Sequence, residues 1–200
     1  MAEPQLRRMT HEEFFAWQER QDRNYELVDG IPVLPTKMMT GASQVHDRVV
    51  VNIIASLHGQ LRGGPCRPTT DDLAVRIPGG NIRRPDVTVE CGQSQSRREF
   101  GVNEPRIAIE VLSPSTMTFD RIRKIPEYQS IATVTHILLI DTEAPRIDVM
   151  SRDADGRWVQ TKYDGIDAKI DLPSVGASLA LADVFEGVDF EPPPGIAVTA

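Results

Sequence analysis

The sequence predicts an α/β (α+β) fold in which helices flank a mixed central β-sheet. Two observations lead to it: nearly continuous apolar runs at 107–112 and 136–141, typical of strands buried on both faces, and helical periodicity from Val45 to Leu61. The 200 residues suit one domain. We expect a single domain over 1–200, with its core at about 10–187 and a loose tail at 188–200.

Local signals place the first elements. Thr10-His11-Glu12-Glu13 has the form of a capping box and predicts a helix over about 10–20. Asp29-Gly30 lies between two short apolar stretches, which is a strong hairpin signal. Apolar residues spaced three to four apart predict a helix at 43–62 with one buried face.

The remaining elements alternate around the two apolar runs. Leu73, Val75 and Ile77 alternate as in a strand with one buried face, and 86–90 is a short strand. A helix is expected over 117–131, where Pro126 should kink it or mark a boundary. Two more strands are expected at 147–150 and 158–163.

Charge and composition restrict the classes of function. The net charge of −7 weighs against tight non-specific DNA binding, which relies on basic surfaces. It weighs little against a site whose carboxylates bind a cation. No apolar run is long enough to span a membrane, and the N-terminus lacks an apolar signal core, so we expect a cytoplasmic protein. Cys66 and Cys91 are expected to be reduced structural thiols.

Glu110 stands out because it interrupts the most apolar strand of the chain. A buried carboxylate must be paired, protonated or bound to a metal. Asp86 begins the preceding predicted strand, so the two acids can converge if these strands are neighbours. Paired carboxylates suit Mg²⁺ or Mn²⁺. Two structural alternatives remain: Asp86 caps a turn, or Glu110 pairs with Lys124 or an arginine.

Several segments in order along the chain carry a family resemblance. They are Tyr25-Glu26-Leu27-Val28-Asp29-Gly30, Arg84-Pro85-Asp86-Val87, Ile109-Glu110-Val111-Leu112-Ser113-Pro114-Ser115-Thr116, the helix with His46 and Ile53, the positions Asp120, Arg121, Lys124 and Tyr128, and Leu138-Leu139-Ile140-Asp141. This combination resembles the Uma2-like restriction endonuclease family (DUF820), a branch of the PD-(D/E)XK nuclease superfamily.

The resemblance implies a restriction-endonuclease-like PD-(D/E)XK core and assigns its chemistry to particular positions. Asp86 and Glu110 would bind the metal, Mg²⁺ or Mn²⁺, together with the backbone carbonyl of Val111. The superfamily lysine would fall at Leu112, so its role is expected to pass to Lys124.

Four further residues are implicated more weakly. Glu26 matches an upstream acidic position, as a further ligand or as a partner of Lys124, and the resemblance makes His46, Arg121 and Tyr128 accessory candidates. Three of the candidates have structural alternatives. Lys124 would be a solvated or salt-bridged lysine, Glu26 an exposed strand residue next to the hairpin, and His46 a satisfied histidine beside an apolar face.

The sequence therefore predicts a metal-dependent endonuclease that hydrolyses phosphodiester bonds of nucleic acid, with DNA as the expected substrate. By analogy with nucleases that cut two strands as symmetric pairs, a homodimer is expected. Two other classes remain open. Leu112 and the net charge of −7 favour a non-catalytic relative that keeps the fold for dimerisation or partner binding. The acidic charge also suits a hydrolase of a small phosphorylated molecule.

Overall fold

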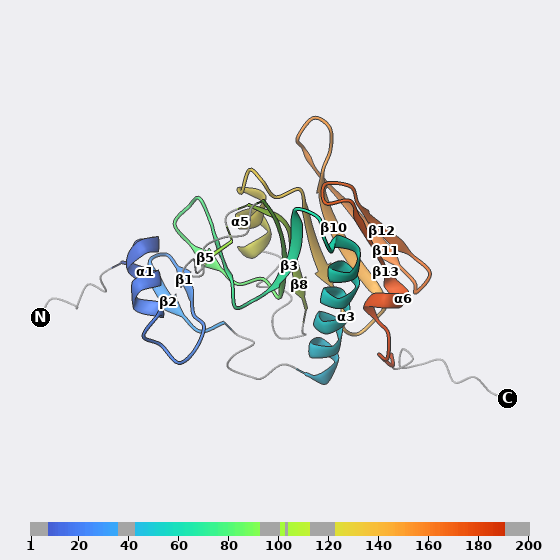
Figure 1. The fold of residues 1–200 in the computed structure, drawn as a ribbon, viewed down its shortest axis with the longest axis horizontal. Coiled ribbons are helices and arrows are strands. Elements are labelled where there is room, and N and C mark those ends of the chain that lie inside the picture. Colours follow the sequence, from blue (N-terminus) through green and yellow to red (C-terminus); the bar gives the residue numbers. More distant parts are fainter. Residues whose placement is uncertain (1–7, 36–42, 93–100, 103, 113–122, 191–200) are drawn as a thin grey trace, which may run out of the picture.

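The computed structural model describes residues 8–35, 43–92, 101–102, 104–112 and 123–190. A six-stranded mixed sheet forms the centre of the molecule (Figure 1). Its strands, in spatial order, are β11 (Trp158–Asp164), β10 (Arg146–Arg152), β9 (His136–Ile140), β8 (Pro105–Val111), β6 (Val87–Cys91) and β3 (Cys66–Thr70). Only the β8–β9 pair of this sheet is parallel. The predicted mixed central sheet is confirmed.

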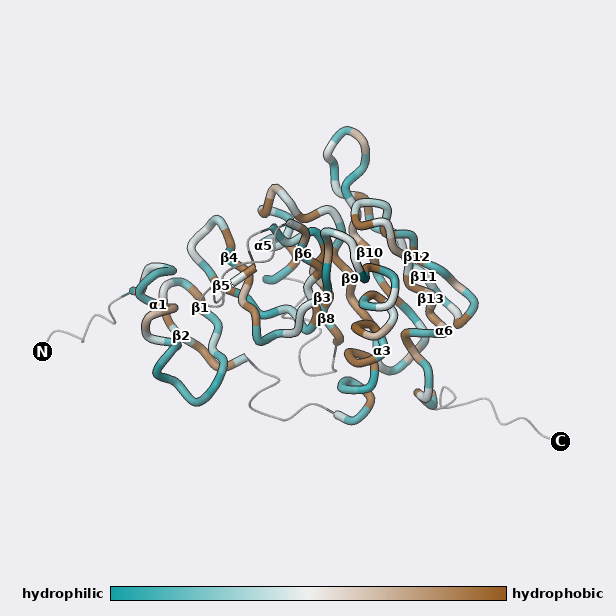
Figure 2. Tube along the Cα trace, in the orientation of Figure 1, coloured by the Kyte–Doolittle hydropathy of each residue, from teal (hydrophilic) through white to brown (hydrophobic). Residues whose placement is uncertain are grey.

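The central strand β8 is buried on both faces because its side chains alternate between two cores. Ile107, Ile109 and Val111 pack on the side of helix α3 (Gln44–Leu61). Ala108 and Leu112, which directly follows the strand, pack on the opposite side, near helix α5 (Ile125–Gln129). Figure 2 shows the apolar segments gathered in these inner strands and along α3.

A second sheet lies on the N-terminal side of the first (Figure 1). Its strand order is β2 (Ile31–Val33), β1 (Glu26–Val28), β5 (Ile82–Arg83), β4 (Ala74–Arg76) and β7 (Gly101–Val102). The predicted hairpin joins β1 to β2, and both Asp29 and Gly30 have positive φ angles of 51° and 79°, as a type I′ turn requires. Helix α1 (His11–Gln18) covers this sheet and begins with the predicted capping box at Thr10.

The C-terminal part adds a hairpin and a short helix over the α3 side. Strands β12 (Lys169–Leu172) and β13 (Ala177–Ala180) form a two-stranded sheet, followed by α6 (Leu181–Val184). The segment predicted as a loose tail begins in contact with this core, because the Phe190 ring packs edge-to-face on Phe185. Residues 191–200 lie outside the described residues.

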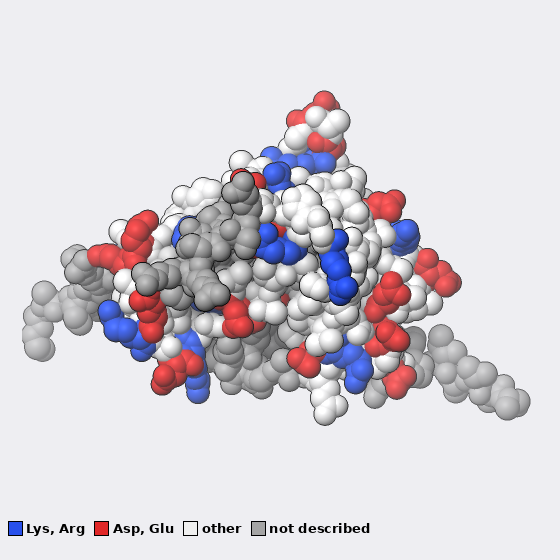
Figure 3. Space-filling view, viewed as in Figure 1, with Lys and Arg blue, Asp and Glu red and all other residues white. Residues whose placement is uncertain are grey.

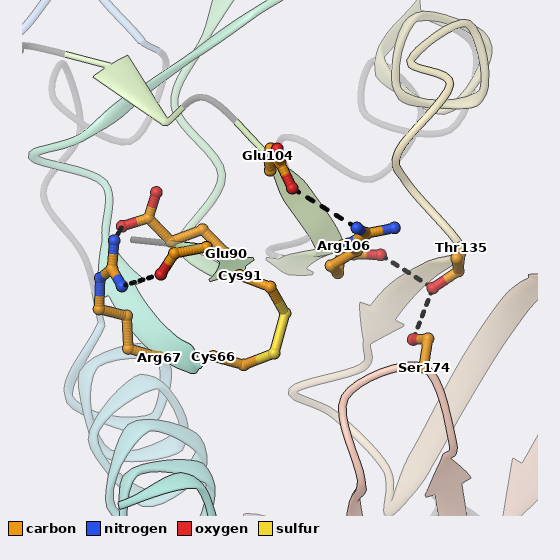
Figure 4. Close-up of a disulfide and its surroundings, with 9 residues drawn as sticks. Cys66, Arg67, Glu90, Cys91, Glu104, Arg106, Thr135 and Ser174 are labelled. Atoms are coloured by element: carbon orange, nitrogen blue, oxygen red, sulfur yellow. Dashed lines mark hydrogen bonds and ion pairs between the residues drawn. A yellow bond between two sulfur atoms is a disulfide. The ribbon is translucent and has the colours of Figure 1, made fainter. Parts of the chain in front are cut away.

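The expected reduced state of the two cysteines is wrong, because Cys66 and Cys91 form a disulfide (Figure 4). They lie opposite each other on the antiparallel strands β3 and β6, with 4.0 Å between their Cα atoms. Arg67 and Glu90, the next opposite pair, form an ion pair at 2.9 Å.

None of the helices in the described ranges is long and apolar enough to cross a lipid bilayer.

Candidate active site

The carboxylate of Glu110 is the centre of a buried polar cluster. Glu110 lies near the end of β8 and is 2% exposed. Lys124 Nζ donates to both of its oxygens at 3.1 Å, and the Tyr128 hydroxyl donates to Oε1 at 2.6 Å. A buried carboxylate needs such compensation. Glu110 is therefore buried but compensated: the Lys124 ammonium group contacts both carboxylate oxygens, and the Tyr128 hydroxyl also bonds to one of them.

Lys124 and Tyr128 reach Glu110 from one element. Lys124 is the N-cap residue of α5 and Tyr128 lies within this helix, so their spacing of four places both on one face. Pro126 falls in the first turn of α5, where its missing N–H costs no helical hydrogen bond. Burial and the charge of Glu110 raise the pKa of Tyr128 well above its usual value, so the hydroxyl stays protonated and remains a donor.

Asp86 directly precedes β6 and lies beside the end of β8. Because Val87 pairs with Ile109, Asp86 is next to Glu110 across the two strands. Its Oδ2 accepts the backbone N–H of Val111 at 2.8 Å. Its Oδ1 is 3.4 Å from Nε2 of His46, which comes from the first turn of α3. The structure thus brings two predicted site acids and His46 to one end of the sheet.

Glu26 approaches the same cluster from the second sheet. Its Oε1 is 4.0 Å from Lys124 Nζ and accepts the backbone N–H of Arg84 at 3.1 Å. Its Oε2 accepts from Nη1 of Arg83 at 3.0 Å. Glu26 is 3% exposed, so it is not the exposed strand residue of the structural alternative. It lies between a buried arginine and the lysine of the site.

Arg83 is a functional candidate that the sequence did not single out. Its guanidinium is fully buried and donates through Nε and Nη2 to the two oxygens of Glu127 on α5. Asn81 also donates to Glu127, at 2.7 Å. Burial lowers the pKa of Arg83, but the contacts with Glu127 and Glu26 outweigh this effect and raise it. Arg83 therefore joins the second sheet to the helix that carries Lys124 and Tyr128.

The sequence held one signal for this arginine. Arg83-Arg84 directly precedes Pro85-Asp86, although two adjacent arginines alone indicate no more than a small basic cluster. Arg84 is also buried, and its side chain donates to the backbone carbonyls of Tyr25, Asp71 and Asp72. Both guanidinium groups are thus internal and are not part of a basic surface.

Leu112 occupies an apolar position in the core. Its side chain is 1% exposed and packs in the core on the α5 side, among Tyr128, Val134 and Leu139. A lysine at this position would place its charge in that core. Lys124 instead brings an ammonium group to Glu110 from the α5 side of the sheet.

The donor atoms at this end of the sheet suit a hard cation in their chemistry. Asp86 and Glu110 supply carboxylate oxygens, and Val111, whose N–H points to Asp86, directs its carbonyl to the same side of the strand. Magnesium binds such oxygen sets while retaining water. Within the described residues there is no group of three or more His, Cys, Asp or Glu side chains that could hold a metal. A cation here would therefore rely on two carboxylates and backbone or water oxygens.

Part of the predicted site falls on residues that the structure does not describe. Arg121, predicted as an accessory residue, and Asp120 lie within 113–122, outside the described residues.

Acidic and basic side chains are interspersed on the face shown in Figure 3, and the described residues form no broad basic surface there. This agrees with the net charge of −7.

Comparison with known proteins identifies the family. Residues 11–182 match the family described as "Uma2: Putative restriction endonuclease". The chain belongs to the Uma2 family. Two uncharacterized Synechocystis proteins are similar to it: one is 30% identical over 92% of this chain and 94% of its own length, the other 25% identical over 82% and 92%.

A solved structure agrees with this Uma2 fold. The crystal structure of "a putative nuclease belonging to DUF820" from Anabaena variabilis superposes with a TM-score of 0.66, covering 88% of this chain and 97% of that one. At 18% identity this likeness shows the fold alone. The family supports a nuclease-like hydrolytic function for this chain.

Proposed function

We propose that this Uma2 chain is a metal-dependent endonuclease that hydrolyses phosphodiester bonds of DNA. The observation that carries the proposal is the buried cluster at the ends of β6 and β8, where Glu110, held by Lys124 and Tyr128, lies beside Asp86. Buried, compensated acids in one place are a costly arrangement that functional sites often contain.

Each residue of the cluster has a chemical role in this proposal. Asp86, Glu110 and the Val111 carbonyl would hold Mg²⁺ or Mn²⁺, which would stabilise the charge that develops on the phosphate. Lys124 orients the attacking water, the role of the lysine that position 112 lacks. Tyr128 keeps Glu110 in place through its short hydrogen bond, and Glu26 restrains the Lys124 ammonium group.

His46 and Arg83 support this machinery without contacting the reacting atoms. His46 Nε2 lies against the Asp86 oxygen that does not bond to Val111, so it fixes the orientation of that carboxylate. Arg83 holds Glu26 on one side and Glu127 of α5 on the other.

The first test is cleavage of supercoiled plasmid in Mg²⁺, in Mn²⁺ and in EDTA. Wild-type protein should nick or linearise the plasmid only with metal. Asp86→Asn, Glu110→Gln and Lys124→Met should each lose activity by about 100-fold or more, since each removes a group that acts in the transition state. Glu104→Gln is the matched control, because the Glu104 side chain is 54% exposed and pairs with Arg106 at the surface. Cleavage that survives in Glu110→Gln would refute this assignment.

A non-catalytic function is the second candidate, because Lys124 and Tyr128 already compensate the buried Glu110 carboxylate. A protein of that kind would cleave neither plasmid nor a small phosphodiester such as bis(p-nitrophenyl) phosphate. Cleavage of the small ester with intact plasmid would instead favour a hydrolase of small phosphorylated molecules.

A further inference from the structure

The outer edge of the six-stranded sheet is formed by β11. Among the described strands, β11 pairs with β10 alone. Residues 159–162 at its centre are all exposed, and Val159 is a large apolar side chain that is 46% exposed. An edge strand carries unpaired N–H and C=O groups that can pair with another strand. The β10–β11 hairpin also extends away from the rest of the molecule in Figure 1.

Two hydrogen bonds determine which backbone groups of β11 face outward. Asp153 N–H donates to Arg157 C=O at one end of the hairpin, and Gly165 N–H donates to Pro145 C=O at the other. Bonded and non-bonded pairs alternate along an antiparallel ladder. The odd-numbered residues of β11 therefore bond to β10. The residues whose N–H and C=O point outward are Trp158, Gln160, Lys162 and Asp164.

We propose that β11 pairs with β11 of a second copy of this chain, antiparallel, about a two-fold axis at Thr161. When the two-fold axis passes through Thr161, the middle residue of β11, every residue of the strand lies opposite a residue of the other copy. The outward N–H and C=O groups then form about eight inter-chain hydrogen bonds. The resulting opposite pairs are Trp158 with Asp164, Val159 with Tyr163, Gln160 with Lys162, and Thr161 with itself. The interface continues one sheet through both copies.

The side chains of β11 favour a second copy as the occupant. In this register the exposed Val159 meets the aromatic ring of Tyr163, a pairing that stabilises antiparallel strands. Lys162 meets the neutral Gln160, so no like charges are directly opposed. Moving the axis to Lys162 would oppose two ammonium groups, and moving it to Gln160 would leave part of the strand unpaired. The strand is thus complementary to itself in its longest register.

This surface is independent of the proposed hydrolytic site, because it rests on the sheet edge and not on Glu110 or Asp86. If both proposals hold, the dimer carries two sites related by the two-fold axis, one for each strand of a duplex. A dimer without cleavage would leave the surface intact and refute only the catalytic function.

Proline at position 160 tests the pairing directly. The Gln160 N–H points away from β10, so Gln160→Pro removes an outward donor without removing a bond of the β10–β11 ladder. Sedimentation velocity should show a dimer for wild type and for Gln160→Ala, and a monomer for Gln160→Pro with an unchanged circular dichroism spectrum. A monomeric wild type at millimolar concentration, or a dimeric Gln160→Pro, overturns the proposal.

Cross-linking tests the register by a second route. Opposite residues of a non-bonded pair have Cα atoms about 4.5 Å apart, within the range of a disulfide. Under mild oxidation, Thr161→Cys should form a covalent dimer at the two-fold axis. Lys162→Cys is the matched control and should not, because its opposite residue is Gln160. Efficient cross-linking of the control, or none of Thr161→Cys, contradicts the proposed register.

Discussion

Replacing Lys124 by methionine should destabilise the protein strongly, because it leaves the Glu110 carboxylate without its cation. Lys124 is 7% exposed, Glu110 is 2% exposed, and the ammonium group contacts both carboxylate oxygens at 3.1 Å. Removing one partner of a buried ion pair costs about 3–5 kcal/mol. For a domain of this size, this corresponds to a fall of about 10 °C in the melting temperature.

A double-mutant cycle with Glu110→Gln separates the pair from the general loss of packing. Free energies of unfolding for wild type, both single variants and the double variant come from urea titrations followed by circular dichroism. The double variant should be more stable than the sum of the single losses predicts, by at least about 1 kcal/mol. Lys169→Met, at an exposed lysine, should change stability by less than about 0.5 kcal/mol. Additive losses would refute the electrostatic account of the cluster.

Three further predictions concern groups outside that pair. Cys66→Ser combined with Cys91→Ser should lower stability by about 3 kcal/mol, because the disulfide closes a loop with a sequence separation of 25, and thiol reduction of wild type should reproduce the loss in thermal melts. Burial lowers the pKa of His136 below its usual value of 6.5, so the neutral imidazole contributes its full stability above pH 6.5 and this contribution is lost as the pH falls toward the lowered pKa. His136→Gln should flatten this part of the curve of unfolding free energy against pH, and an unchanged slope would contradict the prediction. Glu127→Gln should weaken the hold of Arg83 on α5 and increase hydrogen exchange in α5, whereas unchanged exchange there would mean that the helix is held by its apolar contacts.

The sequence predicted the parts of the fold that depend on local patterns. The capping box at Thr10 and the turn at Asp29-Gly30 have the predicted form because neighbouring residues alone determine them. The apolar run around Glu110 identified the central strand, since few segments other than a strand buried on both faces are so uniformly apolar. By the same reasoning Glu110 and Asp86 could converge if their strands were neighbours, and in the structure β6 pairs with β8.

The missed features depend on contacts between distant residues. Arg83 is buried because Glu127 lies 44 positions away and meets it from α5, which no local pattern reveals. The disulfide depends on the register of β3 against β6, and β3 itself, with the sequence Cys-Arg-Pro-Thr-Thr, has no apolar alternation. Short strands such as β5 are likewise determined by their neighbours in the sheet rather than by their own two residues.

Glu127 and Arg83 also show why the site could be only partly inferred from the family. The resemblance supplies positions for Asp86, Glu110 and Lys124, and the structure brings all three to one end of the sheet. The resemblance does not indicate which residues hold Lys124 in position. In the structure this role belongs to Arg83 on β5, which contacts Glu127 on α5 and Glu26 beside Lys124.

The central claim is that Asp86 and Glu110 bind a cation on which hydrolysis depends. Isothermal titration calorimetry of Mn²⁺ into wild type, Glu110→Gln and Glu104→Gln tests it most directly. The account predicts saturable binding to wild type and to Glu104→Gln, with affinity lost by about 10-fold or more in Glu110→Gln. Equal binding by all three proteins, or no binding by wild type, would contradict it, and Glu110 would then be a structural acid neutralised by Lys124.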